Sequence, residues 1–133
     1  MSEKIRILLV DDEPLIVKML GRRLEAEGYE ISIASDGQEA LKKAQMEQPH
    51  LIILDLMLPK LNGYEVCRLL KFDQKFKHIP IMMFTARTQE QDEKLGIECG
   101  ADLYIRKPFK AHELLKQIYS LVPKETPDRS PNV

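Results

Sequence analysis

The sequence predicts an α/β domain in which helices cover both faces of a parallel, five-stranded sheet. Short, continuously apolar stretches alternate along the chain with longer stretches that repeat apolar residues every three or four positions. This alternation is typical of strands and helices that follow one another, with right-handed crossovers between parallel strands. The chain has 133 residues, of which 44% are hydrophobic and 31% charged. These values suit a single globular domain.

Five apolar stretches are the candidate strands. Continuous apolar runs indicate strands that are buried on both faces of a parallel sheet. The second and fifth runs are the weaker ones, since polar residues interrupt the second and the fifth has only three residues. In chain order, the predicted strands are residues 5–10, 29–34, 51–54, 79–84 and 103–105.

The segments between these strands have helical spacing. In the first, Leu20 and Leu24 are four residues apart, Met19 is expected on their side, and Gly28 ends the helix. Asp36 is the expected cap of the second. The fourth segment is the most charged and the least apolar. The predicted helices are residues 14–27, 36–47, 63–72, 89–98 and 111–122.

Composition excludes several classes of protein. Lys and Arg number 20 against 21 Asp and Glu, a balance unlike that of a dedicated nucleic-acid binder. No apolar run approaches the ~20 residues of a membrane span, and no signal peptide is visible. Cys67 and Cys99 are isolated and fit no metal spacing, which favours a reducing cytoplasm. We expect one cytoplasmic domain over residues 1–122, with a flexible polar tail or truncated linker at 123–133.

Charged and hydroxyl side chains follow the strands at the edge where parallel sheets bind ligands. Each residue alone has an ordinary explanation, such as a helix cap for the first two or a turn for the others. Their convergence on one edge is what indicates a site. The candidates are Asp11 and Asp12 after the first strand, Asp55 after the third, Thr85 after the fourth and Lys107 two residues past the fifth.

This set suits phosphoryl transfer. Crowded carboxylates repel one another, and a divalent cation relieves the repulsion. An oxygen-only ligand set without His or Cys favours Mg²⁺. Lys107 and Thr85 would then neutralise and hydrogen-bond phosphoryl oxygens. Asp55, on the central strand, is the candidate nucleophile that would form an aspartyl phosphate.

The sequence resembles the receiver domain of bacterial two-component response regulators over residues 4–122. Together the matching segments are highly specific, although any one alone is not. They are residues 7–13 (ILLVDDE), 49–59 (PHLIILDLMLP), 62–63 (NG), 85–86 (TA), 100–102 (GAD) and 107–109 (KPF). The resemblance implies a single flavodoxin-like (βα)5 domain with strand order 2-1-3-4-5.

The resemblance also implies a role for each site residue. Asp55 would accept the phosphoryl group from a sensor histidine kinase or a phosphotransfer protein. Asp11, Asp12, Asp55 and the backbone carbonyl of Met57 would bind Mg²⁺. Lys107 would pair with the phosphoryl group. The Lys107–Pro108 peptide bond that follows is often cis in the family. Such a domain catalyses its own phosphorylation and dephosphorylation and is not a turnover enzyme.

Thr85 and Tyr104 are the implied switch residues. Thr85 would move toward the phosphoryl group, and Tyr104 would fill the space that Thr85 leaves. The surface formed by residues 89–98, 103–105 and 111–122 would then change its shape and charge. That change would control a partner or output domain. An apolar Met57 also implies slow autodephosphorylation, because it cannot orient a water molecule.

Three other readings fit less well. A haloacid dehalogenase-type phosphatase needs a second acid where Met57 stands, and an FMN-binding electron carrier needs a glycine- and hydroxyl-rich loop where the chain has Asp-Asp-Glu. A degenerate receiver that acts only as a binding module would not need the complete residue set.

The output is open at this stage. The tail after residue 122 is too short for an output domain, so the chain is expected to be a stand-alone receiver or a piece of a larger protein. Residues 63–71 and 78–80 resemble receivers attached to cyclase or hybrid-kinase modules. Of the charged dimer network of winged-helix regulators, only Asp102 matches, whereas Glu93, Leu103, Gln117 and Tyr119 do not. We therefore expect a monomer or weak dimer without direct nucleic-acid binding.

Overall fold

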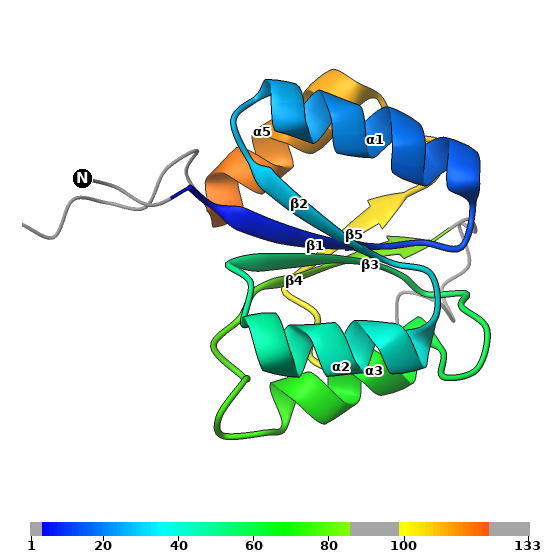
Figure 1. The fold of residues 1–133 in the computed structure, drawn as a ribbon, viewed down its shortest axis with the longest axis vertical. Coiled ribbons are helices and arrows are strands. Elements are labelled where there is room, and N and C mark those ends of the chain that lie inside the picture. Colours follow the sequence, from blue (N-terminus) through cyan, green and yellow to red (C-terminus); the bar gives the residue numbers. More distant parts are fainter. Residues whose placement is uncertain (1–3, 86–98, 123–133) are drawn as a thin grey trace, which may run out of the picture.

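A computed structural model describes residues 4–85 and 99–122, and it has the predicted α/β architecture. Five parallel strands form one sheet in the order β2-β1-β3-β4-β5. Helices α1 and α5 cover one face, and α2 and α3 cover the other (Figure 1). The elements are β1 (Arg6–Val10), α1 (Pro14–Ala26), β2 (Glu30–Ala34), α2 (Gly37–Glu47), β3 (Leu51–Asp55), α3 (Gly63–Lys71), β4 (Ile81–Thr85), β5 (Leu103–Arg106) and α5 (Ala111–Leu121).

Burial of the strands follows their position in the sheet. The central strand β3 is buried along its whole length, and β1 is buried after its first residue. The edge strands β2 and β5 are partly exposed, which explains why β2 accommodates Glu30 and Ser32. One apolar cluster lies beneath α2 and α3 and a second beneath α1 and α5. Both faces of the sheet are therefore packed against helices.

Helix α1 confirms the predicted segment but not the side predicted for Met19. Leu20, Gly21 and Leu24 form the buried face, and Met19 is 61% exposed. Successive helical residues are rotated by about 100°. The buried face extends from Leu20 toward Gly21, so Met19 is turned away from it. The predicted position of Met19 was therefore wrong.

Side-chain caps begin two of the helices. Asp36 Oδ1 accepts a hydrogen bond from Glu39 N at 2.8 Å, which confirms Asp36 as the cap of α2. Asn62 Oδ1 does the same for Glu65 N at 2.9 Å at the start of α3. Both caps satisfy main-chain donors that would otherwise lack a helical partner.

Two predictions fall on residues that the structure does not describe. These are the helix at 89–98 and the tail at 123–133, so the domain boundary at residue 122 stays a prediction. In the described part of the chain, none of the helices has the length and apolar character that crossing a membrane requires.

Candidate functional site

The three predicted carboxylates meet at the carboxyl edge of the sheet. Asp11 directly follows β1, and Asp55 is the last residue of β3. Asp11 is 1% and Asp55 4% exposed, whereas Asp12 faces solvent. One carboxylate oxygen from each of the three residues lies within 4.8 Å of the other two. The convergence predicted from strand ends is confirmed for these residues.

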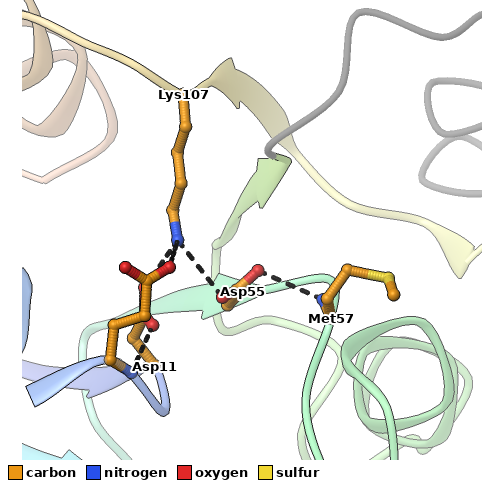
Figure 2. Close-up of polar contacts among 5 residues, drawn as sticks. Asp11, Asp55, Met57 and Lys107 are labelled. Atoms are coloured by element: carbon orange, nitrogen blue, oxygen red, sulfur yellow. Dashed lines mark hydrogen bonds and ion pairs between the residues drawn. The ribbon is translucent and has the colours of Figure 1, made fainter.

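Short main-chain hydrogen bonds hold the two buried carboxylates. Asp11 Oδ1 accepts from Glu13 N at 3.0 Å, and Asp55 Oδ1 accepts from Met57 N at 3.1 Å. In both cases an aspartate bonds the amide two residues later, a turn that its short side chain forms readily. The second oxygen of each carboxylate remains directed toward Lys107 (Figure 2).

Lys107 bridges the two buried carboxylates. Its Nζ lies 2.9 Å from Asp11 Oδ2 and 3.2 Å from Asp55 Oδ2, with Glu13 Oε1 at 3.6 Å. The residue follows β5 directly, one position nearer to the strand than predicted. The Lys107–Pro108 bond is cis, as the resemblance implied.

An aromatic pair lies beside the lysine. The rings of Phe84 and Phe109 stack with centroids 4.9 Å apart, and Lys107 Nζ lies 5.7 Å from the Phe84 centroid. The lysine side chain is 10% exposed. Apolar walls of this kind strengthen the attraction between Lys107 and the carboxylates, because water screens it less.

The electrostatics of the site make Asp55 unusually hard to ionise. Burial and the neighbouring charge of Asp11 raise the pKa of Asp55 from 3.8 to about 6, although Lys107 and the Met57 amide oppose the increase. Burial alone would lower the pKa of Lys107. Its hydrogen bonds and ion pairs with Asp11 and Asp55 outweigh that effect and raise the pKa above its ordinary value. One lysine therefore compensates the carboxylates only in part.

This arrangement fits a hard divalent cation. Three carboxylates supply oxygen donors at one point, and a cleft of about 630 Å³ opens beside Asp12, Met57 and Asn62. Carboxylate-only ligation with room for retained waters is typical of Mg²⁺. The charge balance and the donor set thus agree with the predicted metal.

Two glycines permit close backbone contacts, one with Asp55 and one with Leu61. A β-carbon at Gly63 would lie 2.1 Å from the main-chain oxygen of Asp55, and one at Gly37 would lie 1.5 Å from the main-chain oxygen of Leu61. No larger residue fits at either position without movement of the backbone. The loop between β3 and α3 therefore packs closely against both the end of β3 and the start of α2.

The two predicted switch residues are placed only in part. Thr85 ends β4 and pairs in register with Arg106, but its side chain lies outside the described part of the structure. Tyr104 on β5 is partly buried and packs against the cluster beneath α2 and α3. The structure therefore places both residues near the predicted edge of the sheet without testing their roles.

Sequence reasoning missed three features of the site. These are the contact of Glu13 with Lys107, the aromatic pair Phe84 and Phe109, and the closeness of Gly63 to Asp55. The segments containing Glu13, Gly63 and Phe109 were identified as matching motifs. Their physical roles depend on contacts across the sheet edge, which sequence spacing does not show.

Comparison with curated proteins gives consistent relatives. The alkaline phosphatase synthesis transcriptional regulatory protein PhoP of Bacillus subtilis is 50% identical over 117 residues, which are 88% of this chain and 48% of PhoP. The DNA-binding response regulator MtrA of Mycolicibacterium smegmatis is 45% identical over 113 residues, covering 85% of this chain and 48% of MtrA. The chain thus spans about half the length of these relatives.

Solved structures share the fold over nearly the whole chain. The chemotaxis response regulator CheY4 of Vibrio cholerae has a TM-score of 0.84 at 33% identity, covering 90% of this chain and 100% of CheY4. The receiver domain of sensor histidine kinase PA1611 from Pseudomonas aeruginosa has a TM-score of 0.83 at 28% identity, covering 90% and 98%. That structure is described as having a magnesium ion coordinated in its active site cleft.

The family model of the response regulator receiver domain matches residues 7–119. This region contains the described sheet except for Arg6, the first residue of β1, together with the carboxylate cluster and Lys107. The chain belongs to the receiver domain family of two-component response regulators.

Proposed function

We propose that Asp55 accepts a phosphoryl group from the phosphohistidine of a sensor histidine kinase or a phosphotransfer protein. The observation that carries this proposal is the bridge of Lys107 Nζ between Asp11 Oδ2 and Asp55 Oδ2 at 2.9 and 3.2 Å. A lysine in this position neutralises charge that develops on a transferred phosphoryl group. The same contact holds the acceptor carboxylate in one orientation.

The metal in this proposal is Mg²⁺, with Asp11, Asp12, Asp55 and the Met57 carbonyl as its ligands. When bound, the ion would neutralise phosphoryl oxygens and orient them for in-line transfer. The cluster of three carboxylates supports this assignment, as does the magnesium described for the PA1611 receiver domain.

The chain's own residues would carry out the transfer in a defined way. An oxygen of ionised Asp55 attacks phosphorus, the bond from phosphorus to the donor's imidazole nitrogen breaks, and its electron pair remains on that nitrogen. Met57 N restricts rotation of the attacking carboxylate through its hydrogen bond to Oδ1. Lys107 exchanges part of its contact with the carboxylates for contact with the phosphoryl oxygens. Burial at 4% exposure limits access of water to the acceptor.

The response to phosphorylation is proposed to pass through Thr85 and Tyr104 to the surface of β5 and α5. A cleft of about 340 Å³ lies on this surface, lined by Tyr104, Arg106, Glu113 and Gln117 among others. A change in the position of Tyr104 would alter the floor of this cleft. The domain is then a two-state switch biased by one local charge change.

Transcriptional control is the output that the relatives support. PhoP and MtrA are named as a transcriptional regulatory protein and a DNA-binding response regulator. This part of the protein is proposed to regulate an output domain or partner without touching nucleic acid itself.

Asp102 is the one residue that matches the charged dimer network of winged-helix regulators, and its contacts are made within the chain. Its Oδ2 contacts Lys71 Nζ at 3.0 Å and Ile81 N at 2.8 Å within the chain. These contacts support the expectation of a monomer or weak dimer.

Phosphorylation by acetyl phosphate tests the proposal directly. The wild type with Mg²⁺ should gain one acid-stable, hydroxylamine-labile phosphoryl group, seen by intact mass and by retarded migration in phosphate-affinity gels. Asp55→Asn should abolish the gain, and EDTA should prevent it. Asp73→Asn is the matched control, because this carboxylate caps a turn beyond the end of α3. Phosphorylation that persists in Asp55→Asn would place the acceptor elsewhere.

A further inference from the structure

The two cysteines of the chain meet between α3 and the segment that leads into β5. They are 32 residues apart in sequence, yet Cys67 Sγ donates a hydrogen bond to the main-chain oxygen of Cys99 at 3.5 Å. Both side chains are 0% exposed and belong to the cluster beneath α2 and α3. Both are free thiols. The description of these residues as isolated therefore holds in the sequence but not in the fold.

The two thiols affect each other's ionisation in opposite directions. A hydrogen bond with Cys99, together with burial, raises the pKa of the Cys67 thiol. The same hydrogen bond lowers the pKa of Cys99 in spite of burial. The sulfur of Cys99 is the stronger nucleophile of the pair, since nucleophilicity depends on thiolate character.

Polar and steric contacts hold the two backbone segments together. Lys71, one helical turn after Cys67, places its Nζ 3.0 Å from Asp102 Oδ2. The same ammonium group donates to the main-chain oxygens of Lys77 and Ile79 at 2.8 and 3.0 Å. A β-carbon at Gly100 would already lie 3.1 Å from Lys71 Cβ. These contacts of Lys71 keep the segments that contain the two thiols adjacent.

We propose that Cys67 and Cys99 form a modification site at which a peroxide converts the two thiols into an intramolecular disulfide. With hydrogen peroxide, Cys99 sulfur attacks one oxygen, the O–O bond breaks, and a sulfenic acid and one water form. The Cys67 sulfur then attacks the sulfenic sulfur, the S–O bond breaks, and the hydroxyl leaves with the thiol proton as a second water. The two sulfurs together lose two electrons, which the peroxide accepts.

Burial determines which products can follow. A larger thiol cannot reach a fully buried sulfenic acid, so the nearest reductant is Cys67. The new bond would join α3 to the segment that precedes β5, the strand that contains Tyr104. The site is separate from the carboxylate cluster, and the inference does not rest on the proposed phosphoryl transfer.

Peptide mapping of the folded protein tests this inference. The full chain is treated with hydrogen peroxide, quenched, unfolded, alkylated and digested without reductant. We expect loss of both free thiols, a monomer lighter by two hydrogen atoms, and one linked peptide that contains Cys67 and Cys99. Dithiothreitol should restore both thiols. Sulfinic acids or disulfide-linked dimers in place of the linked peptide would overturn the proposal.

Single-cysteine variants serve as matched controls. Cys67→Ala and Cys99→Ala should give no linked peptide. The remaining Cys99 of Cys67→Ala should accumulate as sulfenic or sulfinic acid, whereas Cys99→Ala lacks the thiol that attacks peroxide and should stay reduced. The wild-type map alone decides the question, even where a variant folds poorly. Asp55→Asn should form the same disulfide as the wild type. That result separates failure of this inference from failure of the proposed function.

Discussion

Replacement of Asp55 by asparagine is expected to stabilise the fold at neutral pH when divalent cations are absent. The carboxyl group is 4% exposed, and burial together with the Asp11 charge raises its pKa to about 6. In the unfolded chain it ionises near the ordinary value of 3.8. The folded protein therefore bears a cost of ionising Asp55 that the unfolded chain does not.

The size and sign of the effect follow from the two pKa values. Each pKa unit corresponds to about 1.4 kcal/mol, so the difference between 3.8 and about 6 corresponds to about 3 kcal/mol. Below pH 3.8 both states are protonated and the cost is absent. It grows as the pH rises from 3.8 to 6 and is complete above pH 6. The pKa of about 6 already includes the favourable contact of the ionised carboxylate with Lys107, so the expected gain at pH 8 is up to about 3 kcal/mol.

Urea unfolding between pH 4.5 and 8 in EDTA measures this difference. The free energy of unfolding of Asp55→Asn should exceed that of the wild type at pH 8, and the gap should close toward pH 4.5. Mg²⁺ should stabilise the wild type more than the variant, since it binds the folded carboxylates. Asp73→Asn serves as the matched control for a change from carboxylate to amide. A pH-independent difference, or a less stable variant at pH 8, would refute the electrostatic reasoning.

Three further substitutions test the geometry of the site. Lys107→Met should leave two buried carboxylates without the lysine ammonium group. The free energy of unfolding at pH 7 should fall by about 3 kcal/mol, and phosphorylation by acetyl phosphate should be at least tenfold slower. Unchanged phosphorylation kinetics would contradict the role of the bridge. Gly63→Ala should shift the Asp55 backbone, because its β-carbon would lie 2.1 Å from the Asp55 oxygen, and denaturant unfolding should show a loss of about 2 kcal/mol or more. Met57→Asn should hasten loss of the phosphoryl group, as its amide can orient water where the 55% exposed thioether cannot; equal decay rates measured by gel would count against that reason.

Strand ends could be predicted from the sequence because burial there is dictated by a few residues. The run at β1 is apolar after Arg6 and is followed by Asp11, and the run at β3 is apolar up to Asp55, its last residue, so the position of Asp11 and Asp55 followed from the rule for parallel sheets. The face occupied by Met19 did not follow. Spacing of four gives the direction of the helical stripe but not its centre, which Gly21 shifts toward its own side.

Contacts between distant segments were the part that spacing could not provide. The meeting of Cys67 with Cys99 and the close approach of Gly63 to Asp55 depend on how α3 lies against the sheet. Neither residue type indicates such a contact in the sequence, because a buried cysteine packs as a small apolar residue and a glycine has no side chain. The sequence predicted that Lys107 lies near the carboxylates. Only the structure shows that it contacts Asp11 and Asp55 at the same time.

The same electrostatic imbalance links stability to signalling in this domain. Asp11 and Asp55 are both buried, and Lys107 compensates them only in part, so the resting site is held at a cost in free energy. A divalent cation relieves that cost by adding positive charge. In the proposed function, phosphorylation would add negative charge at Asp55, which the cation and Lys107 would offset. Lys107 directly follows β5, so a change in its contacts would act next to the strand that contains Tyr104. The proposed switch and the predicted stabilisation by Asp55→Asn thus have one cause, and the unfolding experiment in EDTA examines it without any phosphodonor.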